Sequence, residues 1–335
     1  MNDAAAASDP APVNDLRAGP GGPVGGAGPV TNLGPAQLGQ LALARGSVDH
    51  VTDRRQDADW VAAAWRDPRT RVLVLADGEA PVSDAGELVF VPPAQAPEGI
   101  RVLLGIDTDA VAYFAVLVDQ QVDGPGQLPA GARTAGLRQV GAQLTDRDAG
   151  LLTEAVALAN WHSTHTHCPR CGALTKPAAA GHTRVCPVDG SEHFPRVDPA
   201  VIMLVLDPGD RALLARNRRW PERRVSILAG FVEPGESVEQ AVAREVGEEV
   251  GIAVREVRYL GSQPWPMPRS LMLGFAAEAA GNLELRVDAE EIAEAAWYTR
   301  DELRAAVASG QLRLPPSVSI ARRILESWYG SRLPG

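Results

Sequence analysis

Three carboxylates fall within five residues of the sequence, at Glu245, Glu248 and Glu249. On a helix, positions three and four apart share one face, so these side chains would gather on one side. Like charges placed this way destabilise an isolated helix by about 0.2–0.5 kcal/mol per pair. A bound Mg²⁺ or Mn²⁺ would offset the repulsion, because hard cations prefer oxygen ligands and keep positions for water and phosphate oxygens. The alternative is a solvated acidic helix face.

The residues around these carboxylates predict the elements that position them. Ser237 followed by Gln240 forms a capping-box pattern, and Gly251 suits a helix end, so we expect a helix over residues 238–250. Strands and a few helices in the order found around it indicate an α/β or α+β sandwich. The apolar runs that predict strands are residues 200–206, 212–215 and 225–228, and residues 320–328 predict a closing helix.

The segment from Gly230 to Ile252 resembles the Nudix box, Gly-x5-Glu-x7-Arg-Glu-aliphatic-x-Glu-Glu-x-Gly-aliphatic, and matches it at every fixed position. The resemblance implies a metal-binding loop-helix-loop and water attack on one phosphorus of a pyrophosphate. Gly230 would let the backbone approach metal and substrate closely, which also follows from its missing side chain. The resemblance further implies metal binding by Glu245, Glu248 and Glu249, assistance by Glu236, and orientation of a glutamate by Arg244.

A second segment, residues 262–270, places Trp265 among three alternating prolines. The prolines would hold the backbone extended, and Trp265 offers a flat face for stacking on a base or nicotinamide. Seen alone, the segment could be a Pro-rich surface turn with a packed Trp. It resembles the Ser-Gln-Pro-Trp-Pro-Phe-Pro-x-Ser signature of the NADH pyrophosphatase subgroup of Nudix hydrolases. Met267 replaces Phe, and methionine is adaptable enough to fill the same volume.

The subgroup resemblance implies further site residues. Metal positions fall on the backbone of Ala229 and the carboxylate of Glu291, for which Glu290 is an alternative. Phe194 stands where Tyr is usual, and for Phe194 and Phe231 an ordinary place in the core is the alternative. The substrate-binding positions implied are Arg138, Phe194, Phe231, Gln263, Pro264, Trp265, Pro266, Met267, Pro268, Arg269, Ser270 and Ala321.

Cys168-Pro-Arg-Cys171 and Cys186 resemble the zinc ribbon of this subgroup, which normally ends in Cys-x-x-Cys. Here the fourth position is Asp189. Zinc accepts carboxylate and imidazole as well as thiolate, so Asp189 or His193 could complete a tetrahedral site. Three thiolates in so short a segment predict structural Zn²⁺. The alternative is a ribbon that has lost its metal and is held by packing alone.

At 335 residues the chain is long enough for two or three modest domains. The fold class we expect is α+β, a Nudix α/β/α sandwich preceded by a small β-rich N-terminal domain and a zinc-ribbon-like linker. Thr145 can cap a connector helix between the two domains. The expected divisions are a disordered tail over 1–33, the β-rich domain over 34–142, the connector helix over 143–165, the ribbon-like segment over 166–196 and the Nudix domain over 197–331.

Composition excludes several other classes of protein. The longest apolar run, residues 200–206, is too short to span a bilayer, and no basic-then-apolar leader begins the chain, so we expect a cytoplasmic protein without a membrane partner. A net charge of −10 argues against tight non-specific binding to nucleic acid. Three cysteines, an odd number, favour metal over disulfides in a reducing compartment.

The resemblance implies hydrolysis of NADH or NAD to AMP and nicotinamide mononucleotide by a homodimer, and relatives also remove NAD caps from RNA 5′ ends. We expect the Trp265 segment to be an extended arm that completes the neighbouring subunit's pocket. Two alternatives remain, a Nudix hydrolase of ADP-ribose or another nucleoside diphosphate derivative, and a non-catalytic nucleotide sensor. The Trp265 segment argues against the first, and the complete set of box carboxylates argues against the second.

Overall fold

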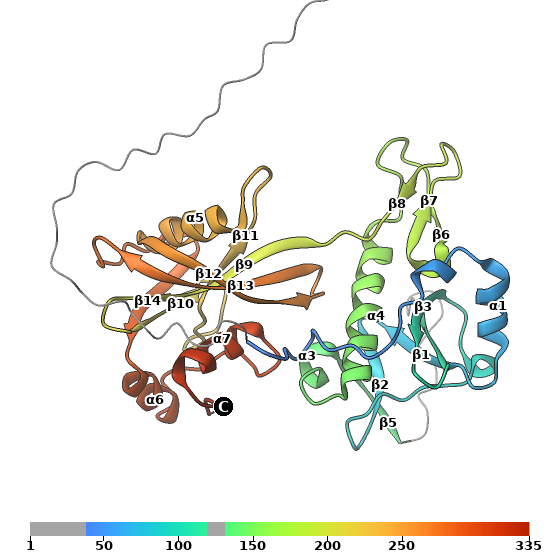
Figure 1. The fold of residues 1–335 in the computed structure, drawn as a ribbon, viewed down its shortest axis with the longest axis horizontal. Helices are drawn as coiled ribbons and strands as arrows, with labels where there is room; N and C mark the ends of the chain where they lie inside the picture. Colours follow the sequence, from blue (N-terminus) through green and yellow to red (C-terminus); the bar gives the residue numbers. More distant parts are fainter. Residues whose placement is uncertain (1–37, 119–130, 335) are drawn as a thin grey trace, which may run out of the picture. The chain divides into compact units, whose positions relative to one another are not determined.

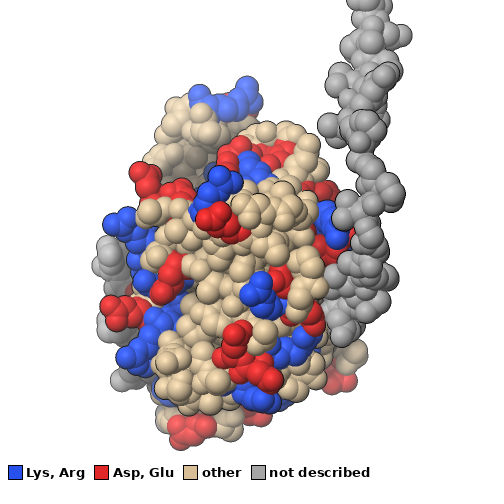
Figure 2. Space-filling view, turned by 90° about the vertical axis from the view of Figure 1, so that its left-hand side faces the viewer, with Lys and Arg blue, Asp and Glu red and all other residues tan. Residues whose placement is uncertain are grey.

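The computed structural model describes residues 38–118 and 131–334. The chain divides into Met1–Thr31 and Asn32–Gly335, and the described residues all belong to the second part. The predicted disorder of residues 1–33 lies outside the described residues. Within the described ranges, no helix combines the length and apolar composition that a bilayer crossing requires. On the face drawn in Figure 2, acidic and basic side chains are interspersed rather than gathered into separate fields.

The first half of the described chain builds a five-stranded sheet with helices packed on both faces. Its elements are η1 (Thr52–Arg54), α1 (Ala58–Arg66), β1 (Arg71–Ala76), β2 (Glu79–Ser83), η2 (Pro93–Gln95), β3 (Ile100–Ile106), β4 (Ala112–Val118), β5 (Ala132–Gly136), α3 (Leu137–Val140) and α4 (Asp146–Thr164). The strand order is β3-β4-β1-β2-β5. Alternate residues of β4 point to opposite faces, so Ala115 packs in the core that includes α4, while Phe114 packs with Trp65 of α1.

The predicted connector helix forms, whereas one apolar run of this half lies outside the regular strands. Thr145 does cap the connector helix, since its hydroxyl accepts a hydrogen bond from the Asp148 backbone N–H at 3.2 Å. The apolar run at residues 88–91 forms no regular strand. It makes only the isolated bridges Val82 with Leu88 and Val72 with Val91. Pro92 and Pro93 come directly after it, and prolines cannot donate to a continuing ladder.

A short three-stranded sheet, in the order β6-β7-β8, separates the two larger sheets in the sequence. Its elements are β6 (Lys176–Ala178), η3 (Ala179–Gly181), β7 (Thr183–Val185) and β8 (Glu192–His193). The cysteines lie in the turns that flank these strands.

The second half is a sheet covered by helices on both faces (Figure 1). Its elements are β9 (Asp198–Leu206), β10 (Ala212–Asn217), β11 (Leu228–Phe231), α5 (Val238–Val250), β12 (Ala253–Trp265), β13 (Ser270–Ala280), β14 (Ile292–Tyr298), α6 (Arg300–Ala308) and α7 (Ile320–Tyr329). The order is β12-β13-β9-β10-β14, and β11 pairs with β9. Successive residues of β9 alternate between two cores. Met203 packs with Val246 of α5, whereas Leu204 packs with Ile324 of α7. Buried on both faces, β9 is the centre of the α/β/α sandwich, and the predicted fold class is confirmed.

Candidate active site and zinc-binding cluster

Helix α5 begins and ends where the sequence predicts. The Ser237 hydroxyl accepts from the Gln240 backbone N–H at 3.2 Å, and the Gln240 side chain accepts from the Ser237 N–H at 2.9 Å. Gly251 ends the helix with a φ of 72°, in the left-handed region that favours glycine. Fixed ends set the rotation of the helix, and the Glu245 carboxylate faces β11 at Gly230, where there is no room for a side chain.

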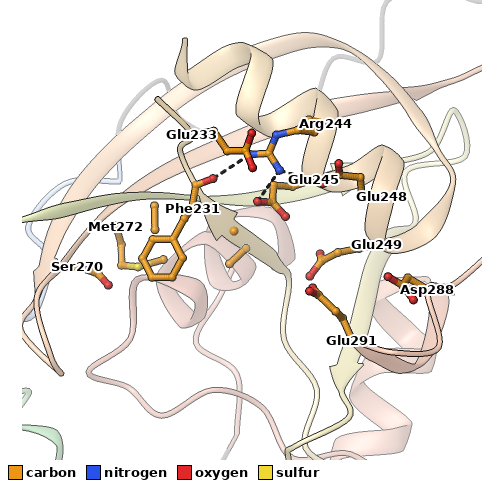
Figure 3. A pocket seen from close by; sticks show the side chains of 13 residues that line it. Phe231, Glu233, Arg244, Glu245, Glu248, Glu249, Ser270, Met272, Asp288 and Glu291 are labelled. Atoms are coloured by element: carbon orange, nitrogen blue, oxygen red, sulfur yellow. Dashed lines mark hydrogen bonds and ion pairs between the residues drawn. The ribbon is translucent and has the colours of Figure 1, made fainter. Parts of the chain in front are cut away.

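Arg244 ties the acidic residues of the loop and helix together. Its guanidinium donates to both carboxylate oxygens of Glu236, at 2.8 and 2.9 Å. It also donates to Glu245 at 3.0 Å and Glu248 at 2.9 Å, and to the Phe231 carbonyl at 2.9 Å (Figure 3). Hydrogen bonding to Arg244 holds the pKa of Glu236 below its ordinary value. Arg244 therefore positions carboxylates rather than facing open solvent.

Glu249 is a buried carboxylate with an unsatisfied oxygen. It is 7% exposed, and its Oε2 has no hydrogen-bond partner among the described residues. Burial, together with the smaller effects of the charges of Glu245, Glu291 and Glu248, raises the pKa of Glu249 to about 8. Burial likewise raises the pKa of Glu245. An orphaned carboxylate oxygen among other carboxylates is a donor set that fits a hard divalent cation.

These groups line a cavity of about 710 Å³. Figure 3 shows the carboxylates of Glu249 and Glu291 pointing toward one another. Glu290, the alternative to Glu291, does not line this cavity, and its N–H donates to Asp288 at 2.9 Å. The lining residues are Ala200, Ala229, Gly230, Phe231, Glu233, Arg244, Glu245, Glu248, Glu249, Ser270, Met272, Asp288 and Glu291.

Sequence reasoning missed four lining residues, Ala200, Glu233, Met272 and Asp288. Two signals were available. Met272 stands two residues after Ser270 in the same strand, and such positions share a face. Asp288 lies on the loop that delivers Glu291, three residues before it.

A second cavity of about 430 Å³ adjoins the first, since Ala229 and Met272 line both. Arg138, Trp265 and Ala321, three of the predicted substrate positions, line it. The guanidinium carbon of Arg138 lies 5.4 Å from the centroid of the Trp265 ring, a cation–π arrangement. The structure thus brings an acidic cavity and an aromatic cavity together.

The Trp265 segment is not an extended arm, and that prediction is wrong. Trp265 pairs with Ser270, so residues 266–269 form the turn of the β12–β13 hairpin. Asn160 of α4 donates to the carbonyls of Pro266 and Pro268, at 2.6 and 3.1 Å. Trp265 and Met267 pack on the core of the chain's own first domain. The alternating prolines are compatible with a tight turn because two of them lie outside the strand ladder.

The remaining residues of this segment have varied surroundings. Gln263 is fully buried, its amide bonded to the Leu43 N–H and the Val318 carbonyl, and it faces neither cavity. Pro264 lies within β12, and Arg269 donates to Asp198 at 2.7 Å. Only Ser270 of this group reaches the acidic cavity.

The two phenylalanines are not core residues. Phe194 is 66% exposed and Phe231 is 59% exposed. Phe231 lines the acidic cavity, whereas Phe194 lies in the connection between β8 and β9. The alternative of a plain core position is therefore excluded for both.

The zinc-ribbon residues form one cluster. The donor atoms of Cys168, Cys171, Cys186 and Asp189 all lie within 4.8 Å of one another. The Cys171 and Cys186 sulfurs are 3.5 Å apart, and Cys168 Sγ lies 3.7 Å from an Asp189 oxygen. Tetrahedral zinc with thiolates at about 2.3 Å requires donor separations of about 3.8 Å, so this set fits the ion. His193 instead lies 3.2 Å from the Ser191 hydroxyl.

Comparison with protein families gives three consecutive matches. The NADH pyrophosphatase-like rudimentary NUDIX domain matches residues 51–161, the NADH pyrophosphatase zinc ribbon domain matches residues 163–194, and the NUDIX domain matches residues 196–317.

Curated relatives align over most of the chain. It is 48% identical over 301 residues to the NAD-capped RNA hydrolase NudC of Mycobacterium bovis (strain BCG), with 85% of this chain and 94% of that protein covered. Identity to NudC of Mycobacterium tuberculosis is 47% with the same coverage. Identity to the NAD-capped RNA hydrolase NUDT12 of Homo sapiens is 42% over 198 residues, covering 56% of this chain and 43% of that protein. Together with the matched domains, these identities establish that the chain belongs to the Nudix hydrolase family, in its NADH pyrophosphatase branch.

Proposed function

We propose that this protein hydrolyses the pyrophosphate of NADH and NAD⁺ to AMP and nicotinamide mononucleotide, and removes NAD caps from RNA 5′ ends. The observation that carries the proposal is the unsatisfied carboxylate of Glu249, which faces Glu291 in an acidic cavity next to one lined by Trp265. Negative phosphates can enter an acidic cavity only with cations, and an aromatic ring beside it suits a base or nicotinamide. The names of the relatives support the same substrates.

The groups that would hold Mg²⁺ or Mn²⁺ are the carboxylates of Glu245, Glu248, Glu249 and Glu291, with the backbone carbonyl of Ala229. When bound, the metal neutralises charge on the pyrophosphate and lowers the pKa of the attacking water. The orphaned Oε2 of Glu249 supports this assignment, because its burial is costly without a cation.

The other residues have roles in positioning and proton transfer. Arg244 keeps the carboxylates of Glu245 and Glu248 in place. Glu248 lines the cavity, and its side chain is 61% exposed. We assign Glu248 the role of general base, which accepts a proton from the water molecule as the water oxygen attacks phosphorus. The bridging P–O bond then breaks, and the second mononucleotide leaves as a phosphate monoester. Trp265 and Phe231 offer faces for the base and nicotinamide.

A cytoplasmic homodimer is part of the proposal. Phe194, Val197 and Phe231 are large apolar side chains that are each at least 59% exposed. Phe194 and Val197 lie just before β9, which pairs with the strand that ends at Phe231. Exposed apolar residues near a site favour burial against a second copy. Sedimentation velocity tests this assembly, and fractionation of expressing cells tests the location.

One incubation series tests the activity. The purified protein is treated with EDTA, given Mg²⁺ or Mn²⁺, and incubated with NADH, NAD⁺, an NAD-capped oligoribonucleotide and ADP-ribose, and the products are separated by chromatography. We expect nicotinamide mononucleotide from NAD⁺ and the capped RNA, its reduced form from NADH, and neither product without metal. Preferential cleavage of ADP-ribose, or metal-independent turnover, would contradict the proposal.

A further inference from the structure

The loop between β10 and β11 is strongly basic. Residues 216–224, which include the last two residues of β10, contain five arginines and one glutamate, in a chain whose net charge is −10. Two of the arginines have partners, because Arg216 pairs with Glu294 and Arg218 donates to the Ala289 carbonyl at 2.7 Å. Arg219 and Arg223 are exposed, and their guanidinium groups make no ion pair with any carboxylate in the described part of the chain.

The same loop places an aromatic ring at the Trp265 cavity. Trp220 and Arg224 both line that cavity, together with Arg138 and Trp265. The Arg224 guanidinium carbon lies 5.0 Å from the Trp220 ring centroid, so the cavity contains two arginine–tryptophan pairs. One pair belongs to the substrate positions already proposed. Neither residue of the second pair is among the predicted substrate positions.

Free NADH and NAD-capped RNA differ in what is attached to the adenosine. The RNA chain continues from the adenosine ribose, and each further nucleotide adds one phosphate and one base. Unpaired arginines suit phosphates, and a tryptophan face suits an unstacked base of any identity. The basic loop leads directly into β11, which carries Ala229 and Phe231 into the acidic cavity. It is therefore next to the site along the chain and borders its aromatic cavity.

We propose that the 218–224 loop binds the single-stranded RNA beyond the NAD cap, with Arg219 and Arg223 on its phosphates and Trp220 under one of its first bases. This inference rests on the proposed function and adds a residue set that distinguishes capped RNA from the free dinucleotide. Two phosphate contacts give a modest effect on affinity, which agrees with an otherwise acidic protein.

The test compares substrates in a double variant, Arg219→Gln with Arg223→Gln. We expect kcat/KM for an NAD-capped ten-nucleotide RNA to fall about tenfold at low salt, with a rise in KM, while kcat/KM for NADH stays unchanged. The slope of log(kcat/KM) against log[salt] for capped RNA should become shallower by about 1.4, since each lost contact to a single strand removes about 0.7. Trp220→Ala should weaken the binding of capped RNA, and the loss should be similar at every salt concentration.

The matched control removes the same two charges elsewhere, at Arg66 and Arg71, which are exposed residues of the first domain. Arg66→Gln with Arg71→Gln should leave capped-RNA hydrolysis unchanged. An equal loss in the control, or unchanged capped-RNA hydrolysis in the loop variant, overturns the proposal. Should the parent protein hydrolyse neither substrate, the proposed function fails separately. Fluorescence anisotropy of a labelled single-stranded RNA with parent and loop variant then decides the loop's role.

Discussion

A Cβ atom added at Gly230 would lie 1.8 Å from Cδ of Glu245. The carboxylate of Glu245 thus occupies the space that any other residue type would need at position 230. Arg244 donates a hydrogen bond to this carboxylate at 3.0 Å. The glycine on β11 and the glutamate on α5 therefore set each other's positions. The placement of the Glu245 carboxylate depends on both the strand and the helix.

Gly230→Ala should displace the Glu245 carboxylate and reduce NADH hydrolysis by about a hundredfold, the cost of roughly 1 Å of misplacement in a catalytic group. Gly247→Ala is the matched control on α5, since nothing lies within 4 Å of an added Cβ there. It should retain activity and gain about 0.5–1 kcal/mol of helix stability. Equal activity of both variants in steady-state assays would refute the coupling.

Glu249→Gln and Glu248→Gln should each lower hydrolysis at least about a hundredfold while the fold stays intact, because an amide keeps the shape of the carboxylate and loses its charge. Circular dichroism verifies the fold, and NADH turnover with saturating Mg²⁺ or Mn²⁺ measures the loss. Glu239→Gln, on the exposed side of the same helix, should behave like the parent. Near-normal turnover of either active-site variant would contradict the metal assignment.

The raised pKa of Glu249 predicts a pH-dependent stability of the metal-free protein. Its ordinary value is 4.5, and burial with the neighbouring carboxylates raises the pKa to about 8. The folded protein then keeps a proton that the unfolded chain has released. This contribution is fully present below about pH 4.5 and is lost as pH rises through about 8.

We therefore expect the Tm in EDTA to fall between pH 5 and 8, with a smaller fall in Glu249→Gln, which should be more stable than the parent at pH 8. Mg²⁺ should reduce the difference by binding the parent carboxylates. Differential scanning calorimetry at both pH values measures it, with Glu239→Gln as the charge control. Identical pH slopes for the parent and Glu249→Gln would contradict this account.

Zinc should copurify at about one ion per chain, and Cys168→Ser should release it and destabilise the protein, because the ribbon is too short to be held by apolar burial alone. Two further variants identify the fourth ligand. Asp189→Ala should lower the zinc content, whereas His193→Ala should leave it unchanged. Elemental analysis that finds no zinc, together with an unchanged Tm in Cys168→Ser, would favour the metal-free ribbon.

Features set by local sequence were predictable, as α5 illustrates. Its start at Ser237 and end at Gly251 depend on hydrogen bonds and backbone angles within a few residues. The alternation of β9 between two cores likewise results from an unbroken apolar run. The box pattern then gives the carboxylates their face on the helix.

Features set by tertiary packing were not predictable. Gln263 matches a signature position, yet its buried amide is hydrogen-bonded to the backbones of Leu43 and Val318. Both residues are far from Gln263 in the sequence, and no local pattern indicates these contacts. Met272 reaches the acidic cavity because β13 pairs with β9, and Asp288 reaches it because its N–H donates to the Glu249 carbonyl of α5 at 3.0 Å. The turn at residues 266–269 depends on Asn160, which lies far away in the chain.

Trp265→Ala should raise the KM for NADH about tenfold and change kcat less than about twofold, because stacking stabilises ground and transition states equally. The hairpin also packs on the first domain, so a second variant must separate stacking from docking. Met267→Ala removes a side chain that packs on the same core and does not line the Trp265 cavity, although its sulfur accepts from the Arg138 side chain at 3.2 Å. It should lower Tm and leave KM near that of the parent. Trp265→Phe, which keeps a flat ring, should restore most of the affinity. A KM that rises equally in Met267→Ala would mean that hairpin docking, rather than the tryptophan face, controls substrate binding.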